Sequence, residues 1–136
     1  MAHAIYGYPG ACKNIHGHSY ELHVTVTAGS DNREYIPAPG FILDFKVLKE
    51  IVTIGIIHSF DHKLVLSSAY LKENPVLLNQ QNLATWAVEP TAENLLIYAR
   101  LTLLEQLPSE VKLVKLKLYE TKDSYAEWTN GHSGIY

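Results

Sequence analysis

A segment of alternating side chains at residues 16–28 constrains the fold of this 136-residue chain more than any other feature. Residues two apart on a strand point to the same face, and positions 22, 24 and 26 are all apolar. The alternation therefore predicts a strand with one buried face. His16 and His18 begin that same face, where an imidazole needs a polar partner or a ligand.

A third histidine, His3, lies upstream beyond the turn-forming residues 7–10. Three imidazoles that leave one position open are typical of catalytic zinc sites. The only cysteine, Cys12, lies four residues before His16, and a thiol beside a cation is favoured as the thiolate. Two alternatives stay open: the histidines are ordinary polar residues of a strand, and Cys12 is a small buried hydrophobe.

Two hairpins are predicted from the strand patterns. The strand at 16–28 would pair with a strand-like segment at 40–44 through a polar, turn-rich connection. Residues 113–120 alternate, with Leu113 as the one apolar exception on the polar face. A short strand at 124–128 would complete the second hairpin.

Two helices are predicted between these hairpins. Asp44 is expected to cap a helix whose apolar residues recur at helical spacing through residue 56. Thr91 is expected to cap a second helix at about 92–107. The segment 59–90 is predicted to be a loop with short helical pieces. The order hairpin, helix, helix, hairpin predicts an α+β fold: an antiparallel four-stranded sheet with two helices on one face.

Composition limits the partners and the compartment. The net charge of −3 gives no basic footprint for nucleic acid, and no apolar run approaches the roughly 20 residues that cross a bilayer. The amino terminus lacks the pattern of a secretory signal, and one cysteine is typical of a reducing compartment. We therefore predict one cytoplasmic domain over residues 1–136, with no nucleic-acid or membrane partner.

Short motifs along the chain resemble, in the same order, those of the 6-pyruvoyl-tetrahydropterin synthase and 6-carboxytetrahydropterin synthase family. The resemblance runs from His3 to about Trp128, and the order of the motifs makes it specific although each motif alone is weak. The matching motifs are His3-Ala4, Tyr8-Pro9-Gly10, Cys12, His16-Gly17-His18-Ser19-Tyr20, Gly40-Phe41-Ile42-Leu43-Asp44-Phe45, Leu48-Lys49, Asp61-His62-Lys63, Pro90-Thr91-Ala92-Glu93-Asn94-Leu95 and Leu118-Tyr119-Glu120-Thr121.

The resemblance implies a tunnelling fold (T-fold), in which the sheets of several chains join around a barrel. It implies a homohexamer of two stacked trimers, with each active site shared between neighbouring chains. The family has a strand before the position that matches His3, whereas only two residues precede it here. The first strand of the domain is therefore expected to be truncated.

The resemblance also assigns the metal and the proton-transfer groups. It implies a zinc ion on His3, His16 and His18. It implies that Cys12 transfers protons together with Asp61 and His62, the aspartate orienting and charging the imidazole. The alternative for the Asp61-His62 pair is a loop without a role.

Three further residues are expected to bind the substrate. Glu120 lies on the apolar face of the strand at 113–120, and its carboxylate can accept two parallel N–H bonds from a pterin. The resemblance implies that role for Glu120 and places Thr91 and Glu93 near the pterin. The alternatives are a strand-end glutamate in solvent and an ordinary helix start.

The activity that the resemblance implies is that of a zinc-dependent lyase. It would convert 7,8-dihydroneopterin triphosphate to 6-carboxy-5,6,7,8-tetrahydropterin with release of acetaldehyde and triphosphate, on the route to queuosine. The four-residue spacing from Cys12 to His16 resembles the bacterial-type group that catalyses this reaction, since the animal-type group has two more residues there. The first alternative is a 6-pyruvoyl-tetrahydropterin synthase, which eliminates triphosphate. The second is a non-catalytic, zinc-stabilised interaction domain with Cys12 as the fourth ligand.

Overall fold

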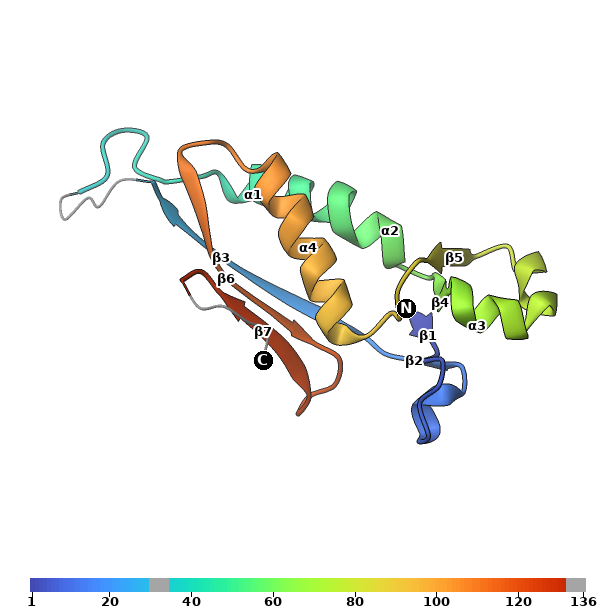
Figure 1. Cartoon of the computed structure of the whole chain (residues 1–136). Coiled ribbons are helices and arrows are strands. Elements are labelled where there is room, and N and C mark those ends of the chain that lie inside the picture. Colours follow the sequence, from blue (N-terminus) through green and yellow to red (C-terminus); the bar gives the residue numbers. More distant parts are fainter. Residues whose placement is uncertain (30–34, 132–136) are drawn as a thin grey trace.

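The chain forms two sheets rather than one. The computed structural model describes residues 1–29 and 35–131 (Figure 1). A long antiparallel sheet contains three strands in the order β3 (Glu21–Ala28), β6 (Val111–Tyr119) and β7 (Tyr125–Thr129). A small mixed sheet contains four strands in the order β2 (His16–Gly17), β1 (Ala2–His3), β4 (Leu64–Ser67) and β5 (Leu83–Trp86). The predicted α+β class is confirmed.

The predicted four-stranded antiparallel sheet is not found among the described residues. Residues 40–44 form no strand, because two nearby prolines, Pro37 and Pro39, lack the N–H groups that a ladder needs. Gly40 adopts a left-handed φ of 87° there. The strand expected at 16–28 is interrupted at residues 18–20, so that its two parts, β2 and β3, belong to different sheets.

Both predicted helices begin where the sequence indicates. The side chain of Asp44 accepts a 2.8 Å hydrogen bond from the backbone N–H of Lys46 and caps α1 (Phe45–Val52). The Thr91 hydroxyl accepts a 3.4 Å bond from the N–H of Asn94 and caps α4 (Ala92–Gln106). Such caps satisfy N–H groups that lack a partner within the helix.

The first helix continues beyond the predicted end. A π-helical segment, η2 (Thr53–Ile57), joins α1 to the short α2 (His58–Phe60). Gly55 lies against α4, and a Cβ at this position would come within 2.7 Å of Thr102 Cγ2. The glycine therefore lets the two helices pack closely.

The segment 59–90 is more regular than predicted. It contains the expected helical pieces, α3 (Ser68–Glu73) and a 3-10 turn, η3 (Pro75–Asn79), but also the strands β4 and β5. Every residue of β4 is buried. A strand buried on both faces has no polar alternation, which is why the sequence pattern did not reveal it.

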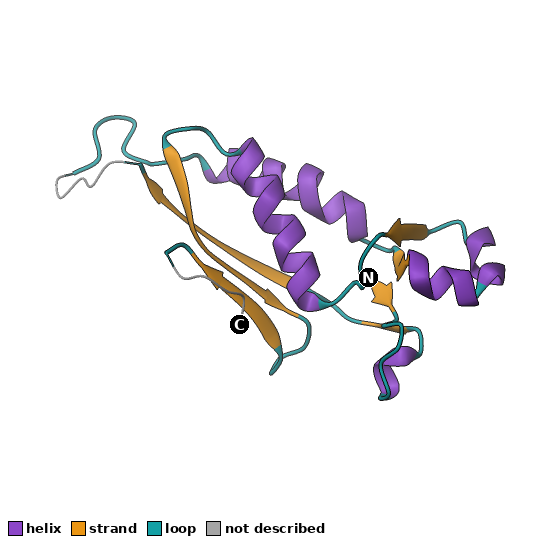
Figure 2. Cartoon of the chain, viewed as in Figure 1, coloured by secondary structure: helices purple, strands orange, loops and turns teal. Residues whose placement is uncertain are grey.

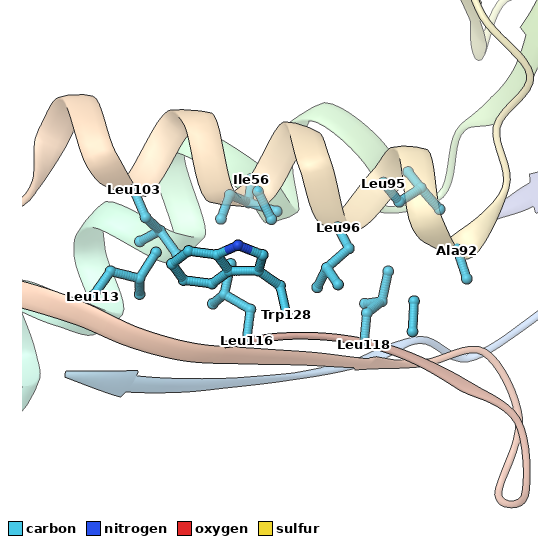
Figure 3. Close-up of a cluster of buried hydrophobic side chains, with 11 residues drawn as sticks. Ile56, Ala92, Leu95, Leu96, Leu103, Leu113, Leu116, Leu118 and Trp128 are labelled. Carbon is cyan, nitrogen blue, oxygen red and sulfur yellow. The ribbon is translucent and has the colours of Figure 1, made fainter. Parts of the chain in front are cut away.

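The main core lies between the long sheet and the layer of α4 and the helical run from α1 to α2, which covers one face of that sheet (Figure 2). Leucines of α4 point toward β6 and β7 (Figure 3). Leu113 joins this core because a bulge shifts the register between β3 and β6, so that Val26 lies opposite Leu113. The buried residues of this core are Ile56, Ala92, Leu95, Leu96, Ala99, Leu103, Leu113, Leu116, Leu118, Ala126 and Trp128.

Among residues 1–29 and 35–131, we find no helix with both the length and the apolar character to cross a bilayer.

Candidate metal centre and active site

The small sheet brings the three predicted metal ligands together. The antiparallel ladder of β1 and β2 pairs His3 with His16. The ladder extends by one pair, since the N–H of His18 donates to the Met1 carbonyl at 3.0 Å and the Met1 amine donates to the His18 carbonyl at 3.2 Å. One ring nitrogen from each of the three histidines lies within 4.8 Å of the others. No other such group occurs in the described part of the chain.

The hydrogen bonds of the imidazoles suit a metal. Nδ1 of His3 donates to the Pro90 carbonyl at 2.6 Å, and Nδ1 of His16 donates to the Asn14 carbonyl at 2.8 Å. With the proton on Nδ1, each Nε2 keeps its lone pair for a ligand bond. His3 is only 2% exposed, and its Nε2 is buried without a hydrogen-bond partner. A buried nitrogen in this state costs free energy, which a bound cation would recover.

Burial also favours the ligand form of His3. It lowers the pKa of His3 below its usual 6.5, although the bond to Pro90 and the charge of Glu120 act in the opposite direction. Only the neutral imidazole binds a metal. These residues therefore fit the zinc that the family resemblance implies.

Glu120 turns its carboxylate toward the histidines. It is the first residue after β6 and is 26% exposed. Its Oε1 atom accepts a 2.7 Å hydrogen bond from the Tyr20 hydroxyl and lies 3.5 Å from His3 Nε2 and 3.9 Å from His18 Nε2. The inward position expected for Glu120 is thus observed, and the solvent-exposed alternative is not.

Sequence reasoning missed Tyr20 as a site residue. Its ring lies edge-on to His18, with 5.8 Å between centroids, and to His3, with 6.1 Å. Burial and the hydrogen bond to Glu120 raise the pKa of Tyr20 far above its usual value, so the phenol stays a donor. The sequence did contain a signal for Tyr20, because it falls at the same alternate positions as His16 and His18 and is therefore expected on the same strand face. A buried phenol there needs a hydrogen-bond acceptor.

Cys12 lies outside the group of metal-binding atoms. It belongs to a short 3-10 turn, η1 (Ala11–Lys13), and is exposed. The backbone N–H of Ile5 donates to its carbonyl at 2.9 Å. A closed shell with Cys12 as the fourth ligand is not what the geometry supports.

Asp61 and His62 follow α2 and lie at the rim of a pocket. The carboxylate Oδ1 of Asp61 is 3.8 Å from Nε2 of His62, and the side chains are 61% and 94% exposed. His62 has a left-handed φ of 56°. The pocket has a volume of about 480 Å³, is otherwise mainly apolar, and is also lined by His18 and Tyr20. The pair thus borders the same space as His18 of the cluster.

The start of α4 faces the same region. The carbonyl of Pro90, which binds His3, directly precedes Thr91. Thr91 uses its hydroxyl as the helix cap, whereas Glu93 is exposed in the first turn. The charge of Glu93 also raises the pKa of Tyr20. Both residues therefore lie on the segment that borders the cluster.

His23 lies apart from the histidine cluster. It is exposed on the other face of β3, its Nε2 paired with the carboxylate of Glu21. Both residues line a second hollow of about 600 Å³, beside Glu120 and Lys122. Glu120 thus stands between the histidine cluster and this hollow.

Comparison with known proteins agrees with the motifs. Residues 1–131 match the family model described as 6-pyruvoyl tetrahydropterin synthase. The chain is 32% identical to the 6-carboxy-5,6,7,8-tetrahydropterin synthase of Haemophilus influenzae, an alignment that covers 94% of this chain and 91% of the relative. It is 34% identical to the protein of the same name from Aquifex aeolicus, with 86% and 75% covered. An uncharacterized protein of Wolinella succinogenes has the same fold, with a TM-score of 0.71, 17% identity, and 95% and 92% of the two chains covered. The chain belongs to the 6-pyruvoyl tetrahydropterin synthase family.

Proposed function

We propose that this chain, a single domain over residues 1–136, is a zinc-dependent lyase. It converts 7,8-dihydroneopterin triphosphate and water to 6-carboxy-5,6,7,8-tetrahydropterin, acetaldehyde and triphosphate. The observation that carries the proposal is the cluster of His3, His16 and His18 beside the carboxylate of Glu120. The relatives named 6-carboxy-5,6,7,8-tetrahydropterin synthase support the choice of reaction.

The three histidines hold the zinc and leave a position for substrate. The carbonyl groups of Pro90 and Asn14 fix two of the imidazoles through Nδ1, so these rings need no reorientation to bind. When bound, zinc supplies a Lewis acid to the hydroxyl oxygens of the substrate side chain.

Glu120 holds the pterin ring. Its carboxylate accepts two parallel N–H bonds from the amino-pyrimidinone edge, and charge-assisted bonds of this kind are the strong ones. The ring is thereby fixed close to the histidines, because Oε1 of Glu120 is within 4 Å of two of them. Thr91 and Glu93, at the start of α4, border the pterin.

Cys12 and His62 move protons. The Cys12 thiolate accepts a proton from a side-chain carbon of the substrate, and His62 returns or relays one. The carboxylate of Asp61 stabilises the charged imidazole of His62. All three side chains are exposed in the single chain. This exposure leaves room for a neighbouring chain to complete the active site, and the family resemblance implies a homohexamer of two stacked trimers.

The enzyme is proposed to act in the cytoplasm on a small pterin triphosphate, without nucleic-acid or membrane partners. A chain with a net charge of −3 and a single cysteine is consistent with this setting.

Incubation with 7,8-dihydroneopterin triphosphate, followed by mass analysis of the products, tests the proposal. Acetaldehyde and 6-carboxy-5,6,7,8-tetrahydropterin are the expected products. Formation of 6-pyruvoyl-tetrahydropterin without acetaldehyde would instead identify the chain as a 6-pyruvoyl-tetrahydropterin synthase. A zinc-loaded protein that forms neither product would favour the non-catalytic interaction domain.

A further inference from the structure

The position of Glu120 raises a chemical difficulty that the proposed function leaves open. A carboxylate is itself a good zinc ligand, and a zinc site with four protein ligands is structural, whereas a catalytic site keeps one position open. Oε1 of Glu120 lies 3.5 Å from His3 Nε2 and 3.9 Å from His18 Nε2. A small movement of the carboxylate would bring it onto a cation held by these nitrogens.

The described residues provide one side-chain hydrogen bond to this carboxylate. The Tyr20 hydroxyl donates to Oε1 at 2.7 Å. The two histidine nitrogens are farther from Oε1 than a normal hydrogen bond reaches. Tyr20 therefore decides where the carboxylate stands between the histidine cluster and the hollow on its other side.

We propose that Tyr20 is a positioning residue that holds Glu120 off the metal, so that the fourth position stays open and the carboxylate stays available to the pterin. The claim about the pterin rests on the proposed function. The claim about the metal rests only on the three histidine ligands and the carboxylate beside them. Tyr20 acts through Glu120 and does not touch the reacting atoms.

The surroundings of Tyr20 suit a fixed donor. Its ring packs edge-on against His3 and His18, with interplanar angles of 86° and 76°, an arrangement that aromatic rings favour. It is half-buried and projects from the segment between β2 and β3. The hydroxyl is thus aimed by the rings that bind the metal, which ties the position of Glu120 to that of the ligands.

The test is Tyr20→Phe, which removes only the hydroxyl, with Tyr98→Phe as the matched control. Tyr98 also loses a hydrogen-bonded hydroxyl, which donates to the Gly55 carbonyl in the helix layer at 3.1 Å. Both variants are loaded with Co²⁺ in place of zinc, because the absorption spectrum of Co²⁺ reports the number and type of its ligands. Metal content and affinity for neopterin are measured in parallel.

Tyr20→Phe should bind one Co²⁺ with an altered spectrum before any pterin is added, and should bind neopterin at least about tenfold more weakly. Tyr98→Phe should match the parent in both readouts. The double variant Tyr20→Phe/Glu120→Gln should recover the parent spectrum, because a neutral amide does not replace the carboxylate as a ligand. An unaltered spectrum together with unaltered neopterin affinity in Tyr20→Phe overturns the inference.

The two proposals fail separately in this experiment. If the parent forms no product from the pterin triphosphate but Tyr20→Phe alters the Co²⁺ spectrum, the proposed reaction is wrong and the positioning role at the metal holds. If the parent turns over and Tyr20→Phe matches it in spectrum and affinity, only the positioning role is wrong. If Tyr20→Phe does not fold, Glu120→Gln alone gives a second test. Because the proposal holds the parent carboxylate off the metal, this variant should have the parent Co²⁺ spectrum, and an altered spectrum would show that Glu120 is already a ligand and would overturn the inference.

Discussion

The two halves of the candidate site differ in how far one chain completes them. In the metal half, His3, His16 and Glu120 each have a defined partner: a backbone carbonyl for each imidazole and the Tyr20 hydroxyl for the carboxylate. In the half proposed to transfer protons, Cys12 is exposed, and the polar atoms of the Asp61–His62 pair are 3.8 Å apart at the surface.

The difference follows from the elements that carry the residues. Strand ladders and the buried Pro90 carbonyl fix the metal half. The proton-transfer groups lie on a short 3-10 turn and at the end of α2, where no ladder restrains them. Catalytic hydrogen bonds are often long before substrate binds and tighten in the complex. The metal half is therefore preorganised, whereas the described chain does not restrain the proposed proton-transfer groups in the same way.

The largest expected effect tests the preorganised half. His16→Ala and His18→Ala should each lose bound zinc, from about one equivalent per chain to almost none, and lose turnover with it. Each removes one of the three imidazoles that form the metal-binding group of the described chain. Elemental analysis and a product assay measure both losses.

His23→Ala is the matched control for this pair. The residue lies on the neighbouring strand β3, but it is 54% exposed and pairs with Glu21. Its replacement should leave zinc content and turnover at the parent level. Full zinc retention in both His16→Ala and His18→Ala would refute the metal assignment.

Cys12→Ala tests the other half. The variant should keep its zinc, because the thiol lies outside the histidine cluster, and should lose turnover by about 10²–10⁴-fold, the usual contribution of a proton-transfer group. Zinc analysis and the product assay on one preparation give both values. Loss of zinc would instead indicate the closed structural site and would remove the contrast between the two halves.

Complementation tests whether a neighbour completes the exposed half. Cys12→Ala and His62→Ala chains, each inactive alone, are co-expressed so that they form mixed oligomers. If each site takes Cys12 and His62 from different chains, about one site in four should contain both, and up to about a quarter of the parent turnover should return. Turnover no higher than that of the separate variants, or an active monomer in light scattering, would contradict the shared site.

Local signals predicted the parts of the fold that depend on neighbours in sequence. Asp44 and Thr91 were recognisable as caps because a cap acts within three residues. The alternation after the histidines predicted the apolar face of β3, whose Leu22 lies opposite Leu118 of β6. The resemblance of ordered motifs supplied the metal ligands, and the structure brings those ligands together.

Long-range pairing explains what was missed. Strand β4 carries no alternation, because β1 and β5 flank it within the sheet and both of its faces are buried. The break at residues 18–20 exists because His18 pairs with Met1 whereas Glu21 pairs with Tyr119, so the chain crosses from one sheet to the other there. Tyr20 lies in this crossing, and its acceptor is a hundred residues away.

The smallest predicted effect concerns Glu120, the residue proposed to hold the pterin ring. Glu120→Gln keeps the shape of the side chain and an oxygen that can accept the Tyr20 hydroxyl, but it puts an N–H group opposite an N–H of the pterin. It should weaken neopterin binding by at least about tenfold, which requires only about 1.4 kcal/mol, against about 1.5–3 kcal/mol for each charge-assisted bond. Zinc content should stay near one equivalent, because the three imidazoles are unchanged. Glu21→Gln is the matched control, since this carboxylate is 71% exposed and faces away from the cluster. Fluorescence titration with neopterin separates the outcomes: parent affinity in Glu120→Gln would make the carboxylate a structural partner of Tyr20 and would leave the pterin without its anchor.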